Sequence, residues 1–518
     1  MSKEKVKSRW LFFGKDKYTY DTIDELVNKS MGLAVGEVVT LNGYCSADDG
    51  ATHKRIIANT AKGFNSITLK NGLYANLIKD SDIKNIVTKE DNRYSEVIGM
   101  LNSDFNVVKI KKNNGKYEAD IEKERFGTHF KTIYIDINSK ETGLGEDYKG
   151  ITLKQFKTNL DSGLYSNYNL KVYFKNKIIT TKDLCGELNF NDKKIELNSL
   201  AKGGTWITTF EDIAPIREEG EKMIYSNPRF TILHLIEFSY LDENGMPSVL
   251  KKVETEAELT KGTYCIVNSE VKVYPFLNGG NLKIYALGMD TGISFKVMSN
   301  YNKFENINFA IHSNKKASCD IYGADKSIIY LKNCKFLCGE YDSLAIHGYY
   351  KALISNCIAA YGNKDCFNYH SNDKSSIAVE VNCIGYGAGM NKTATGNQTA
   401  HSNNATTTHD GMTVYRFGSI GYNCEGPVLA DVNGCKSINF DCYMSGSTTS
   451  SGHNANYFYE PLAGNFNEFV LINCKNGKIT QDGVKIKPDC KFICDYNENI
   501  LENQNINITY DNLFKGGI

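Results

Sequence analysis

The sequence predicts a mainly β protein: a right-handed parallel β-helix, which is a solenoid of stacked strands, with a small N-terminal α+β module. Between residues 320 and 431, successive stretches each open on an aspartate, and these aspartates are Asp320, Asp342, Asp365, Asp410 and Asp431. Three of the four steps between them measure 22, 23 and 21 residues. Each stretch contains short β-branched and aromatic runs broken by Gly, Asn and Ser. A repeat of this length and composition is typical of a β-solenoid.

Two further features keep the same spacing. His347 precedes His370 by 23 residues, and the Asn-Cys pairs that end at Cys334 and Cys357 are also 23 residues apart. Almost no helical periodicity interrupts these stretches. We therefore expect equivalent positions of neighbouring coils to lie directly above one another.

The bulk composition excludes several classes of protein. With 60 Lys and Arg against 60 Asp and Glu, the formal net charge is zero, so we expect no nucleic-acid partner. The 44 Gly and only 7 Pro suit a turn-rich β protein. The N-terminal stretch has no apolar core of a signal peptide, and no apolar run reaches the ~18 residues of a spanning helix. We expect neither export nor membrane insertion.

The cysteines also follow the repeat. Twelve of the 15 cysteines occur from Cys319 onward, many at matching points of the coils. An odd number at such spacing favours reduced thiols stacked inside the solenoid over a disulfide framework. No Cys-x-x-Cys pair faces a second one at zinc-finger spacing.

In chain order we expect six segments. They are an N-terminal module at 1–62, a small β-rich linker module at 63–128, a capping segment with the first coils at 129–205, an insertion or long side loops at 206–263, the main β-helix at 264–497 and a C-terminal tail at 498–518.

Local signals support these boundaries. The run Thr22–Val27 has the acidic first turn of a short helix. Asn-Gly turns separate short β runs in the linker module. After residue 131 a strand leads into a glycine-rich stretch and a helix that we expect to cap the solenoid, because an uncapped end would expose strand edges. Acidic and basic patches interrupt the β rhythm after Trp206.

The segment from Gly36 to Ala58 resembles one near the start of bacteriophage tailspikes and related pectate-lyase-like proteins. The matching residues are Gly36, Val38, Val39, Gly43, Tyr44, Asp49, Gly50, Ala51 and Ile56, and the chain departs from that pattern at Glu37 and Cys45. The resemblance covers about 25 residues. It implies a homotrimer in the virion tail, an N-terminal module that contacts other tail proteins, and a β-helix that binds a host cell-surface polysaccharide.

Candidate chemistry follows from the stacking of coils. Asp342, Asp365, Asp410 and Asp431 are predicted to form a column, in which neighbouring carboxylates raise at least one pKa. The polar stretch from Met390 to Thr408 is too long for one coil and is predicted to form a loop over Asp365 and Asp410. Paired carboxyl groups suit hydrolysis of a glycosidic bond. We expect Asp320 and Asp342 only to open turns.

Other residues are assigned around this pair. Asp365 and Asp410 are predicted to be catalytic, with support from His370, His409 and Asp431. The predicted substrate-binding residues are His401, Tyr369, Tyr415, Arg416 and Glu425, with Arg416 placed to hold a uronate, phosphate or sulfate.

Three functions remain open at this point: a polysaccharide hydrolase, a lyase acting on a uronate-containing glycan, and a non-catalytic receptor-binding fibre of the same fold. Retaining and inverting hydrolysis also remain open, because they depend on the carboxyl separation. No cofactor is expected. A divalent cation bound by the Asp and His residues stays a weaker alternative.

Overall fold

The computed structural model describes residues 18–41, 53–59, 67–77, 107–113, 116–121, 130–180, 188–190, 193–213, 215–226, 232–277, 284–288, 296–311, 317–390, 403–447, 455–462, 468–472, 474–479, 482–486 and 491–495. The chain divides into two compact units, residues 1–123 and 124–518.

The first unit contains a small α+β module. Its five-stranded sheet has the order β1-β2-β3-β5-β4. The elements are β1 (Tyr18–Tyr20), α1 (Ile23–Asn28), η1 (Ser30–Gly32), β2 (Val38–Leu41), β3 (His53–Ala58), β4 (Ile67–Thr68) and β5 (Tyr74–Leu77). The Thr22 side chain caps α1 by accepting a hydrogen bond from the backbone N–H of Glu25. Strands from both sides of residue 62 share this sheet. A separate hairpin pairs β6 (Val107–Asn113) with β7 (Lys116–Ile121).

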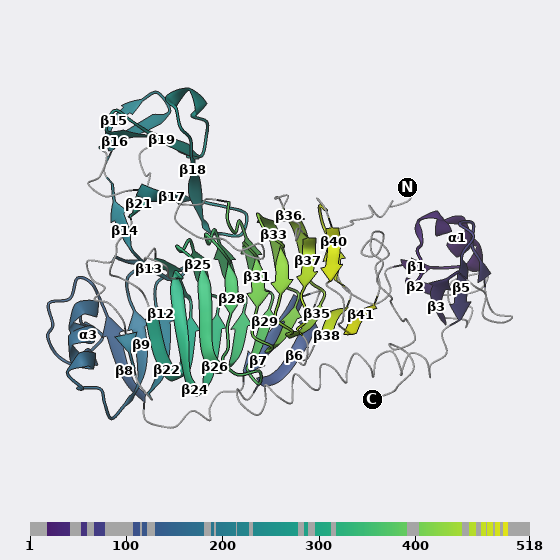
Figure 1. The fold of residues 1–518 in the computed structure, drawn as a ribbon, viewed down its shortest axis with the longest axis horizontal. Helices are drawn as coiled ribbons and strands as arrows, with labels where there is room; N and C mark the ends of the chain where they lie inside the picture. The colour runs from purple at the N-terminus through teal and green to yellow at the C-terminus, as the bar shows by residue number, and fades with distance from the viewer. Residues whose placement is uncertain are drawn as a thin grey trace. The chain divides into compact units, whose positions relative to one another are not determined.

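The second unit contains a right-handed parallel β-helix, as the sequence predicts (Figure 1). One wall is a nine-stranded sheet of β10 (Ile178–Thr180), β13 (Thr205–Thr208), β23 (Ile307–Ala310), β25 (Lys335–Leu337), β27 (Ile358–Ala360), β30 (Ile384–Tyr386), β33 (Ile420–Cys424), β36 (Tyr443–Ser447) and β39 (Lys475–Asn476). Every pairing between neighbouring strands of this sheet is parallel.

The other walls belong to one seventeen-stranded sheet. Its first strands are β8 (Phe130–Ile135), β9 (Asn169–Phe174), β11 (Leu188–Asn189), β12 (Lys194–Ser199), β22 (Lys296–Glu305), β24 (Cys319–Lys332) and β26 (Leu344–Ser355). Beyond β26 each long strand is replaced by two short ones. These are β28 (Phe367–Tyr369) and β29 (Ile377–Val381), β31 (Thr406–Thr408) and β32 (Thr413–Phe417), β34 (Leu429–Asp431) and β35 (Lys436–Phe440), β37 (Ala455–Tyr459) and β38 (Glu468–Ile472), then β40 (Asp482–Ile486) and β41 (Lys491–Asp495).

A tight turn recurs between two walls on successive coils. Asn306, Asn333, Asn356 and Asn382 occupy it with φ between 50° and 57°, a left-handed conformation that Asn tolerates better than most residues. The cysteine that follows each of the last three points inward and is buried. The eleven described cysteines between Cys265 and Cys474 are all buried and free, as the sequence predicts.

Helix α3 (Leu153–Asp161) packs its apolar face on the first coils. Leu153 and Phe156 are buried in the same hydrophobic core as Ile133 of β8 and Val172 of β9. The preceding turn depends on Gly150, whose φ is +74° and whose missing Cβ would lie 2.9 Å from the carbonyl oxygen of Tyr134. This helix covers apolar side chains that belong to the solenoid core.

An eight-stranded sheet is inserted between β13 and β22. It consists of β14 (Phe210–Asp212), β15 (Pro215–Glu219), β16 (Lys222–Ser226), β17 (Ile232–Leu241), β18 (Pro247–Lys252), β19 (Thr263–Val267), β20 (Glu270–Tyr274) and β21 (Ile284–Gly288), with a short helix η2 (Glu256–Glu258). It extends beyond residue 263 to Gly288. Its loop at Asp242–Gly245 contacts the β-helix, where Asp242 accepts a hydrogen bond from Tyr386 and Asn244 bonds to Tyr422.

Candidate functional site

Alternation along four neighbouring strands places polar side chains on one outer face of the β-helix. In β24, β26, β28 and β31 the inward positions are filled by core residues such as Ile321, Ile346 and Tyr369. The side chains at the positions between and after these residues point outward, because successive side chains of a strand alternate. We call this outer surface the histidine face, and its members are Asp320, Tyr322, His347, Asn368, His370, Thr407 and His409.

Four rings of the histidine face stack in a column across four coils. Tyr322 lies 4.7 Å from His347, His347 lies 5.4 Å from His370, and His370 lies 4.3 Å from His409, measured between ring centroids. The ring planes are within 17° of parallel. Each ring occupies the in-register position of the next coil, so the coil repeat itself builds the column.

Asp410 follows His409 and contacts the neighbouring coil. Its Oδ2 lies 3.2 Å from Nδ1 of His370 and accepts a hydrogen bond from the backbone N–H of Ser371. Partial burial acts to raise the pKa of Asp410, but the hydrogen bond and charge of His370 outweigh it and the pKa is lowered. With side-chain exposures of 40% for Asp410 and 37% for His370, this pair is open to solvent.

A second carboxyl pair lies beside the histidine face and is almost sealed. Asp342 and Asp365 occupy equivalent positions of adjacent coils and are 6% and 4% exposed. Asn368 donates from Nδ2 to Oδ2 of Asp342 at 3.1 Å and to Oδ2 of Asp365 at 3.3 Å. Burial raises the pKa of both carboxyl groups, and the charge of Asp365 adds to the effect on Asp342.

The strand register shows that the four aspartates do not form one column, so this prediction was wrong. Asp342 and Asp365 are stacked as expected, but the next coil places Asn404 there, because Phe367 pairs with Thr406. Asp410 is in register with Ser371 instead, one residue beyond the His370–His409 step. Asp365 and Asp410 therefore belong to different columns. Of the expected loop, the last residues form β31, and residues 391–402 lie outside the described residues.

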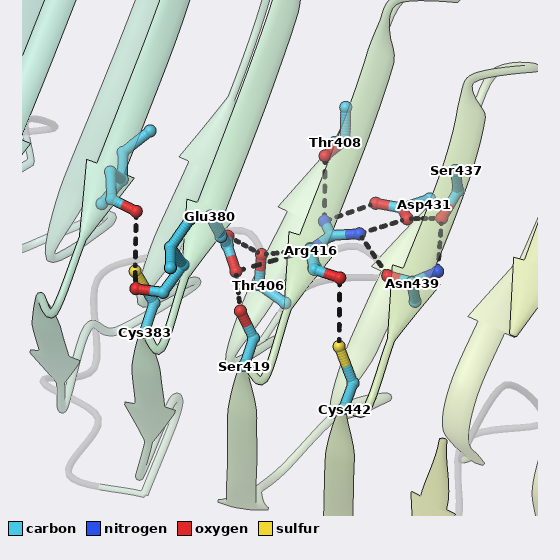
Figure 2. A network of polar contacts seen from close by, with 12 residues as sticks. Glu380, Cys383, Thr406, Thr408, Arg416, Ser419, Asp431, Ser437, Asn439 and Cys442 are labelled. Carbon is cyan, nitrogen blue, oxygen red and sulfur yellow. Dashed lines mark hydrogen bonds and ion pairs between the residues drawn. The ribbon is translucent and has the colours of Figure 1, made fainter. Parts of the chain in front are cut away.

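Asp431 and Arg416 lie inside the solenoid, as Figure 2 shows. The guanidinium group of Arg416 donates to both carboxylate oxygens of Asp431, at 2.7 and 2.9 Å, and lies 3.6 Å from Glu380. Further hydrogen bonds go to Thr406, Thr408 and Asn439. Arg416 and Asp431 are fully buried and cannot reach a polysaccharide. The predicted roles of Asp431 in catalysis and Arg416 in anion binding are corrected accordingly.

The remaining predicted substrate-binding residues fall in three places. Tyr369 is a fully buried inward residue of β28, and Tyr415 is 4% exposed on a different wall, so neither lies on the histidine face. Glu425 is partly buried and lies against Gly389. Glu425 belongs to the coil that follows the coil of Asn403. His401 lies outside the described residues.

Sequence reasoning gave no functional role to five residues at or beside this face: Asp320, Tyr322, Asp342, His347 and Asn368. His347 carried a signal, because it precedes His370 by one repeat length. Its Nε2 lies 3.5 Å from Oδ1 of Asp320. No sequence pattern indicated Asn368, because its contacts depend on which face of the three-residue strand β28 its side chain occupies.

The strand pairing defines a parallel β-helix protein with a histidine- and aspartate-lined outer face. Comparison with solved structures finds several chains of low identity. The pectate lyase Pel9A is 10% identical over 70% of this chain and 79% of that chain, with a TM-score of 0.31. A glycoside hydrolase is 8% identical over 70% and 96%, with a TM-score of 0.32. The tailspike protein gp49 from Acinetobacter baumannii bacteriophage Fri1, a capsular polysaccharide depolymerase, is 10% identical over 89% and 69%, with a TM-score of 0.24.

No protein-family model matches the sequence, and no curated protein matches it. Among the described residues no group of three or more His, Cys, Asp or Glu could hold a metal ion. A search of the same residues found no helix long and apolar enough to cross a membrane.

Proposed function

We propose that the protein is a phage tailspike or tail fibre that binds a host surface polysaccharide and hydrolyses its glycosidic bonds at the histidine face. One observation carries the proposal: a solvent-open Asp410–His370 pair lies at the histidine face, and a buried carboxyl pair with raised pKa lies beside that face. The pKa of Asp410 is lowered, whereas the pKa values of Asp342 and Asp365 are raised. Catalysis by a general acid and a general base requires carboxyl groups whose pKa values are shifted apart in this way.

The chemistry divides between these groups. Asp410, kept ionised by His370 and the Ser371 N–H, accepts a proton from water as that water attacks the sugar carbon. The buried pair that includes Asp365 supplies a carboxylic acid for the leaving oxygen. His409 stacks on His370 and lies 3.2 Å from the Thr407 hydroxyl, so its ring orients its neighbour.

The buried position of Arg416 favours hydrolysis over elimination. A lyase must neutralise the uronate carboxylate while a base removes the adjacent proton, and Arg416 was predicted to hold the uronate. Arg416 is buried away from the histidine face, as are Tyr369 and Tyr415. This burial removes the predicted anion-binding residue from the lyase alternative.

A non-catalytic receptor-binding fibre is the second candidate. It is favoured by the near-complete burial of Asp342 and Asp365, because a carboxyl group sealed from solvent reaches a substrate poorly. In that case the ring column binds glycan through its edges and the carboxyl pair only supports the turn. The proposed trimer, tail location and contacts with other tail proteins rest on the resemblance of the segment from Gly36 to Ala58.

The test is an assay on purified bacterial capsular and cell-wall polysaccharides. We expect new reducing ends without the ultraviolet absorbance of an unsaturated uronate, and a loss of about 100-fold or more in Asp410→Asn. The exposed Asp161→Asn variant on α3 should cleave like the wild type. Unsaturated products would support elimination, and binding without any new ends would support the receptor-binding fibre.

A further inference from the structure

The buried carboxyl pair is asymmetric in its hydrogen-bond donors. Asp365 accepts on Oδ1 from the backbone N–H groups of Asn403 and Asn404, at 3.0 and 2.9 Å, and on Oδ2 from the amide of Asn368. Asp342 accepts from the same amide and from the backbone N–H of Asp365, at 3.2 Å. The chain therefore directs three donors at Asp365 and two at Asp342.

This asymmetry decides which group holds a proton. Donors aimed at a carboxylate stabilise its ionised form, and two neighbouring carboxylates in a dry site resist ionising together. Asp365 accepts more hydrogen bonds than Asp342 does, and the positive charge of Lys364 also acts to lower the pKa of Asp365. Burial raises the pKa of both carboxyl groups. Because the two groups are coupled, the pair loses its protons in two steps, and the extra donors at Asp365 favour the microstate in which Asp342 holds the remaining proton.

The charged groups around Asp342 connect it to the histidine face. Asp365 and Asp320 oppose its ionisation, whereas His370 favours it. His370 in turn bonds to Asp410. One histidine thus lies within electrostatic reach of both the ionised carboxylate and the protonated acid.

We propose that Asp342, bridged to Asp365 by the Asn368 amide, is the general acid of the site, and that Asp365 is a positioning residue that keeps the proton on it. This inference rests on the proposed hydrolysis. The Asp342 proton passes to the glycosidic oxygen as the C1–O bond breaks, and water adds its hydroxyl to C1 while its proton passes to Asp410. Asp410 then releases its proton to solvent and Asp342 takes one up, which completes the cycle.

The test compares pH–rate profiles of three variants on a polysaccharide that the wild type cleaves. Asp342→Asn should lose at least about 100-fold at every pH. Asp365→Asn should retain cleavage but move the alkaline limb to lower pH, because the negative charge that keeps the proton on Asp342 is removed. Asp441→Asn is the matched control: it is 5% exposed and occupies the turn where other coils have Asn, so its profile should match the wild type.

Reversed effects, with Asp365→Asn inactive and Asp342→Asn retaining the wild-type alkaline limb, would overturn the assignment while leaving hydrolysis intact. Thermal melting checks that each variant folds. If Asp342→Asn does not fold, the Asp365→Asn shift decides the question: a limb displaced to lower pH supports the inference, and an unmoved limb overturns it.

A second readout needs no substrate. Infrared spectra recorded across neutral pH should show a protonated buried carboxyl that persists in Asp441→Asn and disappears in Asp342→Asn. A band that survives in Asp342→Asn would contradict the inference. If the wild type cleaves no glycan, the proposed function fails, and this spectrum still reports whether Asp342 holds the proton.

Discussion

Arg416 illustrates how a single residue's role depends on strand alternation. It follows Val414 by two positions in β32, and Val414 points into the core, so Arg416 does too. A charged group there is tolerated only because Asp431 and Glu380 surround it with opposite charge. The sequence shows an arginine in an aromatic run but not the register that pairs it with Asp431.

The buried ion pair gives the first stability prediction. Asp431→Ala should lower the free energy of unfolding by about 3–5 kcal/mol, because Arg416 then remains buried and charged without its bidentate partner. Chemical denaturation measures this. The exposed Asp161→Ala, which removes only a surface pair with Lys157, should change stability by less than about 1 kcal/mol. Equal effects of the two substitutions would contradict the interior position of Asp431.

Asp342 gives a prediction about pH. Its pKa is raised in the folded state to about 8, so its contribution to stability is full below its unfolded pKa of about 4 and is lost as pH rises through about 8. The wild type should therefore lose stability relative to Asp342→Asn over this interval, by on the order of a few kcal/mol. Unfolding free energies at pH 4.5 and 8.5 measure it. A constant difference between the two proteins would count against a raised pKa.

At the scale of elements, the turn that precedes each cysteine explains why the repeat could be predicted. Asn333, Asn356 and Asn382 adopt the same left-handed conformation, and Asn382 donates from its amide to that of Asn356 at 3.1 Å. The repeated Asn-Cys pair in the sequence therefore marks the position of this turn. Local chemistry of this kind is readable without knowing any long-range contact.

Substitution in this turn has a definite expected cost. Asn356→Ala should reduce stability by about 1–2 kcal/mol, because a Cβ residue without a local hydrogen bond is strained at a φ of 52°. Asn356→Gly relieves the strain and should cost less, although it also loses the bond to Asn382. Thermal melting ranks the two variants. A more stable Asn356→Ala than Asn356→Gly would contradict the turn assignment.

The site was less predictable than the repeat. His370, His409 and Asp410 were placed correctly near one another by coil length alone. Asp431 was not, because it is the last residue of a short strand and points inward, whereas Asp410 follows its strand and faces out. Asp431 is in register with Thr408, two residues before Asp410, and Asp410 lies beyond the strand with a φ of 66°. Aspartate spacing therefore located the coils but not the faces.

At the scale of the whole molecule, the fold class followed from the repeat, while the insertion was harder to delimit. Its strands continue to Gly288, and runs such as Thr263–Val267, which resemble solenoid strands, belong to the inserted sheet. Antiparallel and parallel strands of this length have similar composition. Only pairing partners distinguish them.

The proposed tailspike assembly makes a prediction about mass. Light scattering of the purified protein should give three chains of 58.0 kDa each in one particle at micromolar concentration. A homotrimer follows from the resemblance in residues 36–58. A particle of one chain's mass across that concentration range would contradict the tailspike assembly, although it would leave the fold unchanged.

The most direct test of the central claim is a crystal structure of Asp410→Asn with a bound oligosaccharide of a polysaccharide that the wild type cleaves. We predict a sugar chain on the histidine face across β24, β26, β28 and β31, with its scissile oxygen within hydrogen-bond distance of Asp342. A sugar chain bound on the inserted sheet or on the wall that carries Tyr415, with the histidine face empty, would contradict the account.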